Sequence, residues 1–147
     1  MRASSMILVV TISVLFAACG RNEIQVRHFD NLEAAKREQM IEKGWIPPFV
    51  APDARHIEFE SDLDAARVYG SYASGNTTML RKHCSNTADS FRVPGYGPKW
   101  FQDDLKETST AVKLRGKGYE VLCCDEGGFN VVILSSRQFV YYWSERK

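Results

Sequence analysis

The clearest periodic pattern of the chain lies in its last third, where short apolar runs alternate with turn-forming residues. The runs span residues 119–124, 129–134 and 138–143, and the turns fall at residues 125–128 and 135–137. Such runs predict strands, and turns this short join antiparallel neighbours. We therefore predict an antiparallel meander, whose middle run is too apolar for an edge and is expected to be the central strand.

Two further strands are expected in the middle of the chain. Polar and apolar residues alternate over 55–60, which is the period-2 pattern of a half-buried strand. Residues 66–73 hold enough β-favouring side chains for a partner strand, with a bulge expected at Gly70. With the meander, these segments predict a sheet of about five strands.

Three segments have the composition of helices. Residues 32–43 are rich in strong helix formers, with Asp30 placed to cap their start and Gly44 to end them. Shorter helices are expected at 78–84 and 99–108. The predicted fold class is α+β, an antiparallel sheet covered by two or three helices.

The most apolar stretch of the sequence, residues 6–18, follows the short basic start Met1-Arg2. A helix of 13 residues rises about 20 Å, whereas the hydrocarbon core of a bilayer is about 30 Å thick. The stretch is therefore too short to span a membrane and is typical of a signal peptide. We expect residues 1–18 to be a signal peptide, residues 19–29 a tether, and residues 30–147 a single domain.

The charges of the remaining chain are balanced. Of the 19 basic residues one, Arg2, lies in the leader, whereas all 18 acidic residues lie beyond it, which leaves 18 of each sign. A balanced surface gives no electrostatic basis for binding nucleic acid or anionic lipid. We therefore expect no nucleic-acid partner, and attachment to a membrane requires another source.

That source is suggested by Leu15-Phe16-Ala17-Ala18-Cys19-Gly20, which resembles the lipobox of bacterial lipoproteins. The resemblance implies that Cys19 receives diacylglycerol, becomes the mature N-terminus and holds the chain to a membrane, since two or more acyl chains bind stably. The family prefers Leu at the third position before the cysteine, where this chain has Phe16. Gly20 implies, by similarity to Gram-negative sorting, an outer-membrane location facing the periplasm. Ordinary secretion after an A-x-A-like site is the less favoured alternative.

Three cysteines remain for the domain. In an oxidising compartment Cys84 can pair with Cys123 or Cys124, and adjacent strand residues point to opposite faces, so only one of the two suits. Three free buried thiols are an equally good interpretation. No zinc-ligand spacing and no nucleophile signature is present, so we expect neither metal nor cofactor. An enzyme or thiol-redox protein that uses these cysteines is the alternative to a non-enzymatic role.

A proline-rich segment, residues 45–52, cannot form a helix or a paired central strand. We expect a stiff connector whose aromatic residues pack on the domain, in preference to a docking ligand for a partner. A candidate binding loop combines this segment with the acidic turn that follows, through Trp45, Pro47, Asp62 and Asp64. The turn does not match a calcium loop, because Ala and Arg stand where an oxygen ligand and Gly are required.

The segment Gly44 to Ile57, followed by Asp62-Leu63-Asp64 and a strand through Tyr72, resembles a signature of the YbbD head domain. Chains of that family similarly pair a lipobox leader with one compact α+β domain. The signature covers residues 44–73, and Ala65 and Ala66 stand where relatives carry an Asn. The resemblance implies no particular activity. The sequence thus predicts a membrane-anchored binding or assembly module of the cell envelope, with an envelope protein as its partner and an unassigned oligomeric state.

Overall fold

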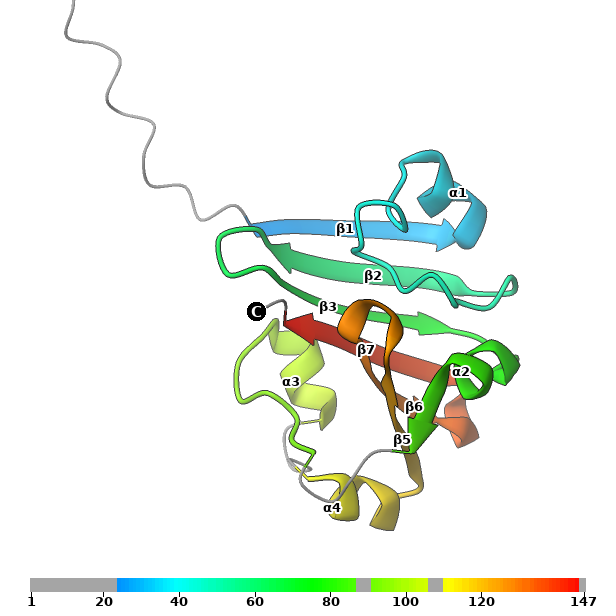
Figure 1. The fold of residues 1–147 in the computed structure, drawn as a ribbon, viewed down its shortest axis with the longest axis vertical. Coiled ribbons are helices and arrows are strands. Elements are labelled where there is room, and N and C mark those ends of the chain that lie inside the picture. Colours follow the sequence, from blue (N-terminus) through cyan, green and yellow to red (C-terminus); the bar gives the residue numbers. More distant parts are fainter. Residues whose placement is uncertain (1–23, 87–90, 106–109, 146–147) are drawn as a thin grey trace, which may run out of the picture.

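The computed structural model describes residues 24–86, 91–105 and 110–145 (Figure 1). Within these ranges one antiparallel sheet contains seven strands in the order β1-β2-β3-β7-β6-β5-β4. The sequence pattern predicted about five, and the two additional strands, β1 and β4, form the edges. The strands are β1 (Ile24–Asn31), β2 (Arg55–Asp62), β3 (Arg67–Ala73), β4 (Cys84–Asn86), β5 (Tyr119–Cys124), β6 (Asn130–Leu134) and β7 (Phe139–Glu145).

Strand β1 occupies most of the segment expected to be a tether. Residues 24–29 belong to this strand, so the tether prediction is wrong for them, and residues 19–23 lie outside the described residues. β1 pairs with β2 from Ile24 opposite Asp62 to Asn31 opposite Arg55. Only one side chain of β1, Phe29, is buried, whereas Ile24 and Val26, which alternate with polar residues, lie on the open face. The apolar alternation is therefore short and does not mark the buried face of the strand.

Strands β2 and β3 confirm the two strands predicted from the middle of the chain. Ile57 and Phe59 of β2 are 1% and 0% exposed, as the alternation requires. The register irregularity falls within β2, between Arg55 and Glu58, and the bulge expected at Gly70 is absent from the pairing of β3. Gly70 has a different role: a Cβ there would overlap the ring of Tyr142, so glycine lets this aromatic ring lie on the backbone.

The first helix is shorter than predicted. α1 (Leu32–Arg37) begins at Asn31, whose Oδ1 accepts a hydrogen bond from the amide of Ala34, and the predicted cap Asp30 lies in β1. The helix ends because Gln39 has a left-handed φ of 60° and the amide of Met40 bonds the carbonyl of Ala35, a Schellman motif without its usual glycine. A second such turn ends at Gly44, the predicted stop.

Three more α-helices lie within the described residues: α2 (Thr78–His83), α3 (Lys99–Leu105) and α4 (Ala111–Gly116). α2 and α3 correspond to two predicted helices, although residues 106–108 of the second lie outside the described residues. α4 was not predicted. The turns of the meander hold the 3₁₀ segments η1 (Glu126–Gly128) and η2 (Ser135–Arg137), and β5, β6 and β7 confirm the meander. β6 is interior, but the middle position belongs to β7.

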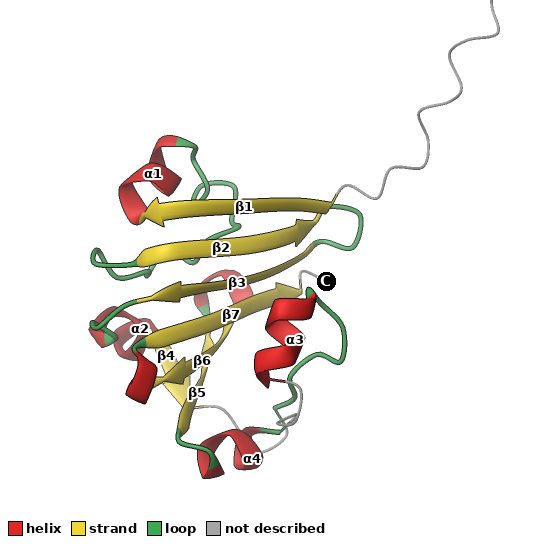
Figure 2. Ribbon diagram, turned by 180° about the vertical axis from the view of Figure 1, so that it is seen from behind, coloured by secondary structure: helices red, strands yellow, loops and turns green. Residues whose placement is uncertain are grey.

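The helices and loops cover the two faces of the sheet unequally (Figures 1 and 2). α1, α2 and residues 38–54 cover the first face, over a core that includes Phe59 and Tyr142. α3 and α4 cover the second face, but their core, which includes Phe101 and Trp143, takes side chains from β3, β7, β6 and β5 alone among the strands. The second face of β1 and β2 therefore remains open, and Val26 is 48% exposed there.

Candidate functional site

A pocket of about 170 Å³ opens at the end of the sheet where β2 turns into β3. Its walls come from the ends of β2 and β7, the start of β3 and the turn that precedes the proline-rich segment. Apolar and polar residues both line it: Trp45, Leu63, Ala66 and Val68 are apolar, and Ser61 and Ser144 carry hydroxyls. Asp62 and Arg67 also border the pocket, but their side chains belong to the alternate row of the sheet, which faces the second side. Such a lining suits a small amphipathic group.

Ser61 is the most informative residue of the pocket. It lies in one row of the sheet with Val68 and Ser144, all on the first face. The Ser144 hydroxyl donates to the carbonyl of Gly127 at 3.2 Å, whereas the Ser61 hydroxyl, on a residue only 1% exposed, has no hydrogen-bond partner in the structure. A buried hydroxyl without a partner is destabilising, so a group in the pocket that bonded it would gain affinity. The alternation of β2 places Ser61 on the same face as Phe59, so the sequence pattern itself carries the signal for this residue.

Trp45 is held on the pocket wall by contacts at both its backbone and its ring. Its carbonyl oxygen accepts a hydrogen bond of 3.2 Å from the buried Tyr142 hydroxyl. Its ring lies 5.6 Å from that of Phe59, centroid to centroid, and the Lys43 ammonium lies 5.5 Å from the ring centroid. The side chain is therefore half-buried in a fixed position, which suits a recognition residue.

The β2–β3 turn forms the outer wall. Asp62 Oδ1 accepts a hydrogen bond of 3.0 Å from the amide of Ala65, and Ala66 takes a left-handed φ of 50°. These features hold the turn closed and leave Leu63 at its tip 40% exposed. On the second face, the Arg67 guanidinium lies 4.3 Å from the ring centroid of Tyr96, a cation–π contact.

The structure brings together two of the four residues predicted for a binding loop. Trp45 and Asp62 line the same pocket. Pro47 is buried and Asp64 is exposed, and neither lines it. The proline-rich segment packs on the domain, with Phe49 1% exposed, which confirms the connector interpretation.

Three carboxylates follow one another along the open second face of β2: Glu58, Glu60 and Asp62. Burial, together with the charges of Asp62 and Glu58, raises the pKa of Glu60. His28 of β1 lies beside this column, with its Nδ1 3.9 Å from Glu58 Oε1. In the described part of the chain no group of three or more His, Cys, Asp and Glu residues has the arrangement to hold a metal ion.

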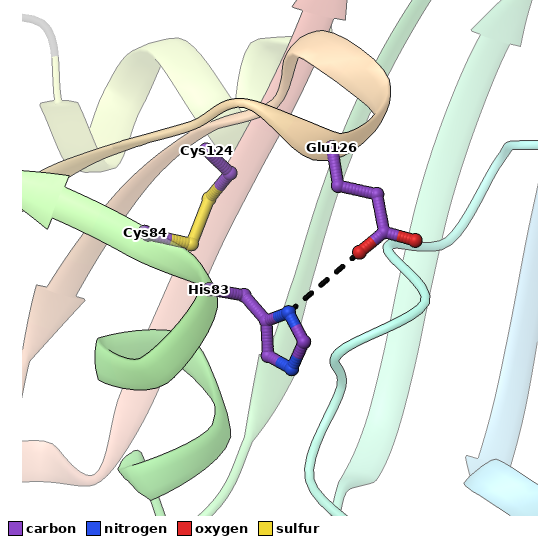
Figure 3. The surroundings of a disulfide bond; sticks show 4 residues. All are labelled: His83, Cys84, Cys124 and Glu126. Atoms are coloured by element: carbon purple, nitrogen blue, oxygen red, sulfur yellow. Dashed lines mark ion pairs between the residues drawn. A yellow bond between two sulfur atoms is a disulfide. The ribbon is translucent and has the colours of Figure 1, made fainter.

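Cys84 and Cys124 lie on β4 and β5, at the far edge of the sheet from β1, and Figure 3 shows the disulfide that joins them. Of the two pairings that the sequence left open, the structure contains Cys84–Cys124, which joins β4 to β5 at a directly paired position. Cys123 is a half-buried free thiol. Beside the disulfide, His83 Nδ1 lies 3.6 Å from Glu126 Oε2, and the imidazole stacks on the ring of Phe49.

Cys19 and the apolar leader lie outside the described residues. Over residues 24–86, 91–105 and 110–145, none of the helices combines the length and apolarity that crossing a membrane requires. Lipidation and cleavage of the leader therefore stay predictions.

Comparison with protein families matches part of the chain. Residues 23–73, about a third of the chain, match the family model of the YbbD head domain, to which this segment is thus similar. The match begins earlier than the signature recognised in the sequence and spans β1, α1, β2 and β3. Every residue that lines the pocket except Ser144 lies within it. Neither the curated proteins nor the solved structures contain a match.

Proposed function

We propose that this chain, which resembles the YbbD head domain over residues 23–73, is a lipid-anchored module of the bacterial cell envelope. Cys19 holds it to a membrane, by its sequence context the outer membrane, and the domain faces the periplasm. The pocket at the end of the sheet binds an envelope protein partner, and the domain performs no catalysis.

The main structural support for the proposed envelope location is the Cys84–Cys124 disulfide. Both cysteines are buried, 9% and 1% exposed, and they sit on directly paired residues of β4 and β5. Structural disulfides form and persist in oxidising compartments such as the periplasm and are rare in the cytosol. A buried structural disulfide therefore supports the export that the leader sequence predicts.

The pocket supports a binding role because its volume suits one side chain and its polar groups are already in place. The Trp45 ring and Val68 give it apolar contact, and the unpartnered Ser61 hydroxyl gives it a hydrogen-bonding position. A projecting apolar or aromatic side chain of a partner, with a polar tip, is the kind of group that this lining accepts.

The alternative, a thiol-redox protein, has weaker support. Redox-active disulfides are accessible to the attacking thiolate of a partner. The Cys84–Cys124 bond is enclosed, and Cys123 lies on the opposite side of the strand from Cys124. Thiol counting tests this alternative: a redox role requires the native disulfide to react rapidly with a small dithiol, whereas a structural bond resists until the domain unfolds.

The proposal is tested in the full chain with Cys19→Ser. We expect this substitution to abolish incorporation of labelled fatty acid and to move the protein from the membrane fraction to the soluble fraction. Cys123→Ser is the matched control, because it removes a thiol that the anchor does not use, and it should leave both readouts unchanged. Membrane retention of the Cys19→Ser protein, or a mature N-terminus other than residue 19, would refute the proposal.

A further inference from the structure

Exposed apolar side chains gather at one end of the sheet. Among the described residues five large apolar side chains are exposed: Ile24, Val26, Leu63, Tyr96 and Val112. The first four, at 40–48% exposed, belong to this end, and we call them the apolar rim. Val112, on α4, lies away from it. The rim is therefore a localised feature of the surface, unlike the scattered apolar residues that any protein shows.

The strand register places the rim residues side by side. Ile24 is paired with Asp62, and Asp62 with Arg67, so the three form the last row across β1, β2 and β3. Leu63 follows at the tip of the β2–β3 turn, and Tyr96 lies over the Arg67 guanidinium. In Figure 1 this end of the sheet is at the left, where β1 begins, β2 turns into β3 and β7 ends.

The chain enters the domain at this same end. Ile24, the first residue of β1, stands five positions after Cys19. Five residues span at most about 17 Å even when fully extended. A lipidated Cys19 therefore keeps the start of β1 within that distance of the membrane.

We propose that the apolar rim rests on the lipid surface that holds the anchor, with Leu63 and Ile24 in the boundary between headgroups and acyl chains. This inference rests on the proposed lipidation of Cys19. Tyr96 suits the interface because its ring is apolar and its hydroxyl polar, and Arg67 beneath it can reach headgroup phosphates. The contact orients the domain with its strands directed away from the membrane and the pocket mouth close to it.

The charged residues at the apolar rim favour contact with a lipid surface that carries no net charge. Arg67 is paired with Asp62 on one side and with Glu145 on the other, so this row has no excess of basic residues. The chain beyond the leader carries equal numbers of basic and acidic residues. Attraction to anionic lipid needs a basic cluster, which this row lacks. The rim therefore binds through apolar contact, and zwitterionic lipid is sufficient.

The test is photo-crosslinking in the full, membrane-bound chain. Leu63→p-benzoyl-phenylalanine, Tyr96→p-benzoyl-phenylalanine and the control Val112→p-benzoyl-phenylalanine are irradiated in cells whose phospholipids carry labelled phosphate. The label distinguishes membrane phospholipid from the protein's own diacylglycerol, which has no phosphate. We expect a phosphate-labelled adduct from positions 63 and 96 and none from position 112.

Fatty-acid labelling of the same samples separates the two proposals. If the chain carries fatty acid and stays in the membrane fraction but positions 63 and 96 give no phospholipid adduct, or give adducts only with protein, the rim does not rest on lipid and the anchor stands. If the chain carries no fatty acid and is soluble, the anchor and the orientation that depends on it both fail.

Discussion

Reduction of the Cys84–Cys124 bond should cost the domain a large share of its stability. The two cysteines are separated by 40 positions, so the bond closes a loop of that length in the unfolded chain. The chain-entropy relation for a loop of about 40 residues gives about 4 kcal/mol at 25 °C. Because single domains are stable by about 5–15 kcal/mol, this loss should be large in any unfolding assay.

The measurement is urea unfolding followed by the fluorescence of the three tryptophans, with and without reductant. The reduced protein should unfold at a lower urea concentration. The double variant Cys84→Ala with Cys124→Ala should resemble the reduced protein and be insensitive to reductant. Cys123→Ala is the matched control: it keeps the bond, so its response to reductant should equal that of the unchanged chain.

Two results would refute this reasoning. A change below about 1 kcal/mol on reduction would mean that the closed loop does not constrain the unfolded chain as the entropy relation requires. Loss of the reductant response in Cys123→Ala would mean that Cys84 pairs with Cys123, contrary to the register in which Cys84 lies opposite Cys124.

Two further changes test the pocket and the open face of the sheet. Ser61→Ala should raise the free energy of unfolding by about 1 kcal/mol because it removes a buried hydroxyl without a partner, whereas Ser144→Ala should lower it by about 1 kcal/mol because it leaves the Gly127 carbonyl unbonded. Urea unfolding of both variants measures these changes. A Ser61→Ala variant that is less stable than the unchanged chain would show that the hydroxyl is bonded in solution. Burial and the charge of Asp62 raise the pKa of Glu60, so the charged form disfavours the fold, and stability is lost as pH rises through that pKa. Glu60→Gln should therefore raise the melting temperature at about pH 7 and leave it unchanged near pH 3, and equal shifts at both pH values would contradict the assignment.

The features that the sequence predicted correctly are those set by local patterns. The meander of β5, β6 and β7 follows from short apolar runs separated by turn residues, and β2 from its alternation. β1 was missed because an edge strand with an open face needs few apolar side chains. The end of α1 was missed because Gln39 adopts a left-handed conformation that usually calls for glycine, and the packing around Met40 supports it.

The candidate site was predicted only in part for a similar reason. Trp45 and Asp62 stand out in the sequence as an aromatic residue in a proline-rich segment and an acid in a turn. Ser61 and Ser144 join them only through the pairing of β2 with β3 and of β3 with β7. That pairing connects positions more than 70 residues apart in the chain, which no local pattern reveals.

The two edges of the sheet differ in how firmly they are held. β4 is covalently joined to its neighbour, whereas β1 depends on hydrogen bonds to β2 and on the packing of its one buried side chain, Phe29. Partial opening of the fold should therefore begin with fraying of β1, whose amides should exchange with solvent before those of β5 and β6. If Cys19 anchors the chain as proposed, a force along the polypeptide acts on this less stable edge first, so β1 should separate from the sheet while β4 stays attached through the disulfide.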